Sequence, residues 1–152
     1  MQVTQDPYSY RNDSEVPAFD DSAPIAVMDA ECALCSWGAR TIHHLDKSGL
    51  LRICPVQSPL GSAILQHYEI NSLDPESWLF LEDGTSYQDM EAVIRVGQRL
   101  GGWGNLVLAL KLVPRPLRSW LYLRVARNRY RLFGKGDMCA IPDPDFQKRL
   151  MR

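Results

Sequence analysis

Two short apolar runs flank a helical stripe in the first half of the chain. Residues 25–28 form a continuous apolar run and residues 50–54 a second short apolar run that includes Arg52, and both have the length expected for buried strands. Between them, apolar residues recur at helical spacing from residue 33 onward, and the stripe ends near Gly49. Because one crossover helix favours parallel strands, this order predicts a βαβ unit.

The pattern continues with a helix, a hairpin and further helices. Ser58 and Pro59 are residue types that begin helices, and apolar positions follow to His67. An Asp-Gly pair at 83–84 separates two β-prone runs, which predicts an antiparallel hairpin. The remaining stripes predict three helices, over residues 89–100, 103–113 and 117–134. The expected fold is α/β, with a βαβ unit and a hairpin in one sheet flanked by helices, and a C-terminal helical extension.

Neither end of the chain shows this periodicity. Residues 1–23 combine acidic residues, prolines and small polar residues, so we expect a mostly disordered acidic leader. Residues after Gly136 have no clear pattern, and we expect an irregular tail there. The predicted division is a leader at 1–23, one α/β domain at 24–142 and a tail at 143–152.

Composition narrows the function classes. The net charge of −1 gives no overall field for nucleic acid or membrane, and we expect no nucleic-acid partner. The most apolar late stretch, residues 103–113, is far shorter than the roughly 20 residues that span a bilayer. Four cysteines are too few for a disulfide-stapled scaffold, and the chain starts without a secretory signal. A reducing, cytoplasmic location is therefore expected.

Cys32 and Cys35 stand between the first apolar run and the first helical stripe. A cysteine at a helix N-terminus faces unpaired backbone N–H groups, which favour the thiolate that attacks disulfides. Cys35, one turn further on, is placed to resolve a mixed disulfide at Cys32. A Cys-x-x-Cys pair directly after the first strand of a βαβ unit is typical of thioredoxin-like redox sites.

Two other interpretations of the pair stay open, a zinc half-site and two structural thiols. Zinc would need further ligands, and the candidates His43, His44 and Cys54 complete no recognised spacing. We therefore expect no metal and no bound cofactor. The expected partners are protein or small-molecule thiols and disulfides, and the oligomeric state stays open.

The run from Asp29 to Cys35 has the form Asp-x-x-Cys-x-x-Cys, and it resembles the signature of the DCC family of thiol-disulfide oxidoreductases. Later landmarks resemble that family in the same order, including residues 82–87, 100–103 and 126–134, with coverage from about residue 25 to 142. The resemblance implies a thioredoxin-like fold and disulfide exchange through the paired thiols. Ala33 stands where the commoner family form has proline.

Two more residues are candidates for the site. Asp29 could serve as an acid–base group beside the thiols, or as an anion at the helix start. Thioredoxin-like sites also place a cis-proline against the cysteines, where it keeps a backbone edge open to substrate. Pro75 is the candidate for that substrate-binding role, and an ordinary trans-proline in a loop is the alternative.

Residues 111–131 contain one lysine and six arginines and no acidic residue. The favoured interpretation is that the arginine stems lie over a core helix, with their charged heads in solvent. The functional alternatives are contact with an anionic membrane, an anionic substrate, or the acidic leader. A non-catalytic thioredoxin-like module that docks on a protein or membrane through this helix is accordingly the rival to an enzyme.

Overall fold

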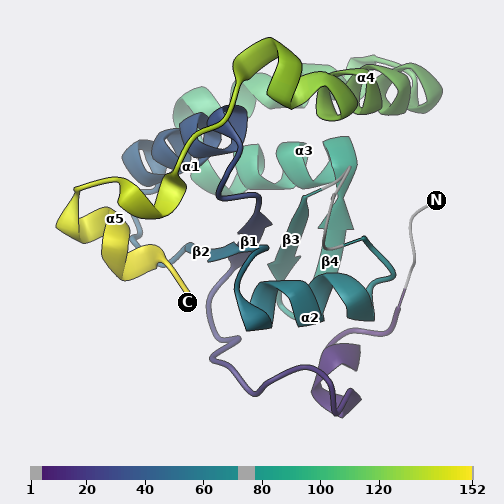
Figure 1. The fold of residues 1–152 in the computed structure, drawn as a ribbon. Coiled ribbons are helices and arrows are strands. Elements are labelled where there is room, and N and C mark those ends of the chain that lie inside the picture. Colours follow the sequence, from purple (N-terminus) through teal and green to yellow (C-terminus); the bar gives the residue numbers. More distant parts are fainter. Residues whose placement is uncertain (1–4, 72–77, 152) are drawn as a thin grey trace.

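The computed structural model describes residues 5–71 and 78–151, and its centre is a four-stranded sheet (Figure 1). The strands are β1 (Ile25–Met28), β2 (Arg52–Pro55), β3 (Leu79–Glu82) and β4 (Thr85–Gln88), in the order β2-β1-β3-β4. β1 is parallel to β2 and antiparallel to β3, which pairs antiparallel with β4. The predicted βαβ unit, hairpin and α/β class are confirmed.

Helices cover both faces of the sheet (Figure 1). α1 (Ala33–Leu45) and α3 (Asp89–Leu100) pack on one face, and α2 (Pro59–His67) packs on the other. Side chains of adjacent strand residues point to opposite faces, so each central strand supplies both cores. Ala26 and Phe80 face α1 and α3, whereas Val27 and Leu79 face α2.

Local chemistry accounts for the turn and the cap that the sequence predicted. Asp83 and Gly84 both have positive φ, as a two-residue hairpin turn with the sheet's twist requires. Ser58 caps α2, because its Oγ accepts the Gly61 N–H at 3.0 Å, and Pro59 occupies the first helical position. A side chain at Gly61 would meet the Pro55 carbonyl oxygen at 2.1 Å, so this turn needs glycine.

Two C-terminal helical segments cross the face formed by α1 and α3. The first, Gly102–Leu112, is a 3-10 helix rather than the α-helix expected, and Gly104 approaches Gly97 of α3 closely. The second, α4 (Arg115–Phe133), is a long α-helix, as predicted. Within the described residues no helix is long and apolar enough to cross a membrane.

The described part of the leader, residues 5–23, packs against the α2 side of the sheet. Tyr10 lies in a short 3-10 helix (Ser9–Asn12), is 3% exposed and donates a hydrogen bond to Asp21 at 2.9 Å. Tyr8 and Phe19 pack on the same core. This segment is therefore not the solvated tail that composition led us to expect, because a few aromatic side chains hold it.

The expectation of an irregular C-terminal tail is also wrong. Residues 144–149 form α5 (Pro144–Arg149), which Asp143 caps through the N–H groups of Asp145 and Phe146. Phe146 is fully buried in the core under α1. Arg149 forms a buried ion pair with Asp46 at 2.7 Å. The ion pair and the apolar contacts of Phe146 together hold the C-terminal segment against the domain.

Candidate active site

The two thiols lie at the junction of β1 and α1, where the sequence placed them. Cys32 is the residue that precedes α1, and Cys35 is in its first turn. The Cys35 thiol hydrogen-bonds to the Cys32 sulfur, and the backbone N–H groups of Cys35 and Leu34 also bond to it. These bonds outweigh the effect of burial and lower the pKa of Cys32 to about 6.

Cys35 has the opposite shift. Its hydrogen bond to Cys32, its burial and the nearby negative charges all raise the pKa of its thiol far above the ordinary value. The surroundings of the pair therefore favour the thiolate at Cys32 and the protonated thiol at Cys35. This asymmetry is what a nucleophile and a resolving thiol require.

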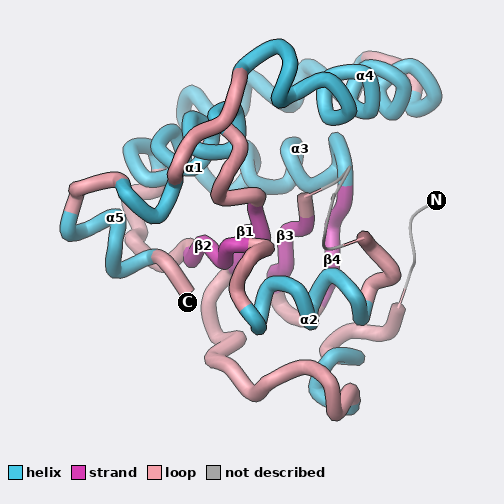
Figure 2. The backbone as a smooth tube through the Cα atoms, in the orientation of Figure 1, coloured by secondary structure: helices cyan, strands magenta, loops and turns pink. Residues whose placement is uncertain are grey.

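A segment of the chain's C-terminal part covers Cys32. We call residues 134–138 the strap, because they run past the start of α1 after α4 ends (Figure 2). The Gly136 N–H bonds to the Glu31 carbonyl at 2.8 Å, and the Met138 N–H bonds to the Ala30 carbonyl at 2.9 Å. Cys32 is 0% exposed as a result, whereas Cys35 is partly exposed.

Asp29 anchors α4 to the loop that carries the thiols. Its carboxylate is 4% exposed and accepts hydrogen bonds from Gln57 Nε2 at 2.7 Å, Arg129 Nη2 at 3.1 Å, the Tyr130 hydroxyl and the Glu31 N–H. Burial opposes ionisation of this group, but these bonds prevail and lower the pKa of Asp29. A carboxylate held in this way keeps its charge, so the geometry favours positioning over proton transfer.

The partners of Asp29 could not be recognised from the sequence. Gln57, Arg129 and Tyr130 are 28 to 101 positions away from it along the chain, and spacing gives no signal over such separations. The one available signal is that residues 126–134 are among the landmarks of the family resemblance. The expectation that arginine heads lie in solvent is wrong for Arg129 and Arg118, which are buried; Arg118 pairs with Glu91 at 3.2 Å.

Other candidates lie away from the pair. His43 is eight residues beyond Cys35 on α1, about 12 Å along the helix, and its ring bonds to Asp143 and Arg149. Cys54 packs on the α2 side of the sheet, and burial raises the pKa of its thiol. Pro75 lies outside the described residues, so its substrate-binding role stays a prediction.

The remaining thiol, Cys139, packs on the opposite face of the sheet from Cys54. All four cysteines are free thiols. Among the described residues no group of three His, Cys, Asp or Glu side chains is arranged to hold a metal ion.

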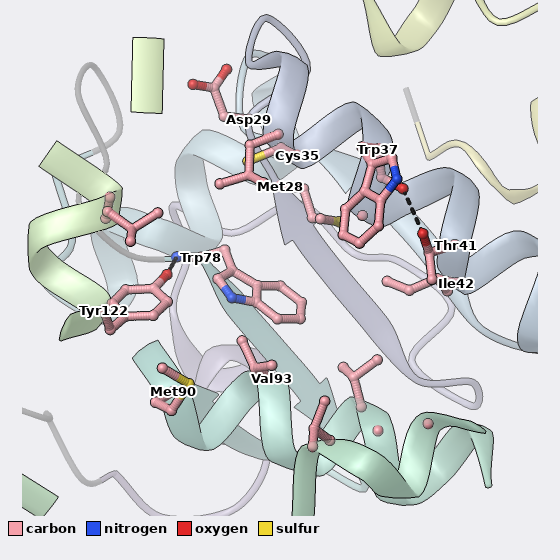
Figure 3. Close-up of a pocket in the computed structure, with 18 of the residues that line it drawn as sticks. Met28, Asp29, Cys35, Trp37, Thr41, Ile42, Trp78, Met90, Val93 and Tyr122 are labelled. Atoms are coloured by element: carbon pink, nitrogen blue, oxygen red, sulfur yellow. Dashed lines mark hydrogen bonds between the residues drawn. The ribbon is translucent and has the colours of Figure 1, made fainter. Parts of the chain in front are cut away.

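A large apolar cavity of about 470 Å³ opens beside Cys35 (Figure 3). Its walls come from the end of β1, from α1 and α3, and from the 3-10 helix and α4. Cys35 and Asp29 lie close together at one end, and Val93 and Met90 lie across the cavity from them (Figure 3). The partly exposed thiol of the pair therefore borders a space that a ligand can enter.

The sheet order and the paired thiols at the first strand–helix junction define a thioredoxin-like protein with a Cys-x-x-Cys site. The chain belongs to the DCC1-like thiol-disulfide oxidoreductase family, whose sequence model matches residues 26–135. It is 32% identical to the uncharacterized protein YuxK of Bacillus subtilis over 127 residues, 84% of this chain and 93% of that protein.

A second relative is a chloroplastic DCC family protein of Arabidopsis thaliana. It is 30% identical to this chain over 123 residues, which are 80% of this chain and 72% of the plant protein. No solved structure matches the chain. Family membership supports a redox function in general terms, and the geometry of the pair supplies the detail for a specific proposal.

Proposed function

We propose that this protein is an enzyme that exchanges disulfides through Cys32 and Cys35. The observation that carries the proposal is the placement of the two thiols at the start of α1, where Cys32 precedes the first turn and Cys35 lies within it beside the cavity. Cys32 receives hydrogen bonds from the first turn of α1 and from Cys35, which lower its pKa to about 6. The burial of Cys35 and its bond to Cys32 raise the pKa of Cys35.

The exchange proceeds in two substitutions at sulfur. The Cys32 thiolate attacks one sulfur of a substrate disulfide, a mixed disulfide forms, and one substrate thiolate leaves and takes a proton from water. Cys35 then loses its proton and attacks the Cys32 sulfur, and the second substrate thiolate leaves. The substrate gains two electrons and the protein ends with a Cys32–Cys35 disulfide. The same steps in reverse oxidise two substrate thiols.

Asp29 is a positioning residue in this scheme. Its negative charge raises the pKa of Cys35, which keeps the resolving thiol protonated until the mixed disulfide has formed. Its hydrogen bond from Arg129 also holds a cation near the pair, and that cation lowers the pKa of Cys32. The acid–base role expected as one alternative for Asp29 is less well supported, because its own pKa is lowered.

Access to Cys32 needs a movement of the chain, because Cys32 has no exposed surface. A substrate can reach it when the strap separates from residues 30–33, or from the cavity past Cys35.

A trapping experiment tests the assignment of roles. Cys35→Ser should accumulate a mixed disulfide at Cys32 with a model disulfide, because the resolving thiol is gone, whereas Cys32→Ser should trap far less. Cys54→Ser is the matched control and should behave as the wild type, since Cys54 is buried on the other face. Mass spectrometry of the intact protein measures the adducts. If both site variants are equally inert, the roles are wrong.

The rival function is a binding module that docks through the C-terminal helices. Large apolar side chains are exposed there, among them Trp103, Leu106, Leu112 and Trp120, and the segment is rich in arginine. That surface would suit a protein or an anionic membrane. A Cys32/Cys35 pair that never oxidises reversibly, combined with sedimentation on anionic vesicles, would favour this function over the enzyme.

A further inference from the structure

We propose that the apolar cavity beside Cys35 is the substrate pocket, and that it takes small, uncharged, apolar thiols or disulfides. This inference rests on the proposed function and names its substrate class. The cavity volume of about 470 Å³ lies within the range of roughly 300–1,000 Å³ found for small-molecule sites. Because Cys35 lines it, a sulfur of the bound molecule lies beside the resolving thiol there, and Cys32, which does not line the cavity, reaches that sulfur only by the movement past Cys35 described above.

The walls of the cavity explain the apolar preference. Most of the lining side chains are aliphatic or aromatic, including Leu34, Val93, Val96, Leu100 and Val125. The charged groups, Asp29 and Arg129, pair with each other at 3.1 Å. A charged substrate such as glutathione disulfide would lose hydration here without gaining a free partner.

Tryptophan side chains at the cavity expose apolar surface that a bound ligand would cover. Trp37 is 66% exposed and Trp103 is 77% exposed, and both line the cavity. The indole of Trp78 lies between the Cys35 end and Val93 (Figure 3). An apolar molecule that covers these rings removes apolar surface from water, which stabilises the complex.

The position of the strap favours a small-molecule substrate over a polypeptide substrate. A peptide substrate of an α/β sheet protein commonly pairs its backbone with an exposed edge of the chain. Beside Cys32 that edge is already occupied, because Gly136 and Met138 bond to the carbonyls of Glu31 and Ala30, and Ala33 donates to Gly134 at 3.3 Å. The cavity reaches Cys35 without requiring those bonds to break.

Exchange kinetics with two aromatic disulfides test the proposal on the reduced, full-length protein. Dithiodipyridine is uncharged, dithiobis(nitrobenzoate) carries two carboxylates, and each rate is divided by the rate of the same reagent with free dithiothreitol. We expect the normalised rate of the uncharged reagent to exceed that of the charged one by about tenfold or more. Glutathione disulfide should be as slow as the charged reagent.

Filling the cavity should remove the preference. Val93→Trp places an indole in the space, and Val125→Trp at the exposed rim is a second variant in case the first fails to fold. Each should lower the normalised rate of the uncharged reagent about tenfold, with no change in the reduction potential of the pair. Arg40→Trp, on the exposed side of α1, is the control and should change neither quantity.

Binding of a sulfur-free probe separates the pocket from the chemistry. The uncharged dye phenylnaphthylamine should bind the wild type and Arg40→Trp, and should bind the filled variants about tenfold more weakly. Suppose that the pair oxidises reversibly, but that both reagents react at equal normalised rates and the cavity-filling variants do not change them. That result would overturn the proposed substrate pocket and leave the proposed function standing. A pair without reversible oxidation would overturn both, even where the dye binds.

Discussion

Replacing Arg129 with methionine should destabilise the protein more than any change at an exposed arginine of the same helix. The substitution keeps most of the side-chain volume and removes the cation that lies 3.1 Å from Asp29. Both side chains are buried, with 7% and 4% of their surface exposed, so the carboxylate is left as an unpaired charge. Removal of one partner of such a pair costs about 3–5 kcal/mol.

The cost should lie near the lower end of that range. Gln57 and Tyr130 still donate to Asp29 in the variant, and α4 keeps its apolar contacts. For a chain of this length about 3 kcal/mol corresponds to a fall in Tm of roughly 6–12 °C. Loss of the cation should also raise the pKa of Cys32, because Arg129 is one of the groups that lower it.

Urea denaturation of the reduced protein measures the free energy of unfolding, and the ultraviolet absorbance of the thiolate measures the pKa of Cys32. Arg124→Met is the matched control, since Arg124 is exposed on the same helix and should cost less than about 1 kcal/mol. If Arg129→Met is no more costly than this control, the ion pair does not hold α4 to the site. Our account of Asp29 would then be wrong.

Three further predictions follow from the same geometry. First, thiolate absorbance of the reduced protein should rise with a midpoint near pH 6, and Cys32→Ser should lack that rise. Because the folded pKa is lowered from 9.0, the stability that this thiolate contributes is present above about pH 9 and is lost as the pH falls through about 6. Second, Gly136→Val should loosen the strap, since a Cβ there would already lie 3.1 Å from the Ala33 Cα. Alkylation of Cys32 by a bulky maleimide should then accelerate, and an unchanged rate would mean that the strap does not limit access. Third, Ser58→Ala should cost about 1 kcal/mol in urea denaturation through loss of the α2 cap, and a neutral result would contradict that cap.

Local pattern was enough to predict the elements that carry the thiols. The apolar run before Asp29 and the helical stripe after Cys32 each depend on neighbouring residues, and both elements are where we expected them. The Asp-Gly pair likewise predicted the hairpin, because its conformation is set within two residues. The sequence therefore located the Cys32/Cys35 pair and the sheet beside it.

Contacts between distant segments could not be predicted in this way. Asp29 pairs with Arg129 across 100 positions, and the strap reaches the thiols only because α4 returns the chain to α1. At the ends, single aromatic residues such as Tyr10 and Phe146 fix segments whose composition is polar. A single buried aromatic side chain changes neither the hydrophobic periodicity nor the mean composition of a segment. Both ends of the chain were therefore expected to be irregular.

Family membership and the geometry of the site give different kinds of information about function. The family places a thiol-disulfide function on the chain in general terms, and the relatives add no substrate. The asymmetry of the thiols, the covered Cys32 and the apolar cavity at Cys35 are features of this structure. The cytoplasmic location and the partner thiols stay predictions.

The reduction potential of the Cys32/Cys35 pair tests the central claim most directly. The protein is equilibrated across a series of glutathione buffers, the free thiols are alkylated, and the oxidised fraction is measured by mass spectrometry. Our account predicts one reversible two-electron transition, present in Cys54→Ser and absent in Cys32→Ser and Cys35→Ser. A pair that stays reduced at every ratio, or a disulfide that involves Cys54 or Cys139 instead, would contradict it.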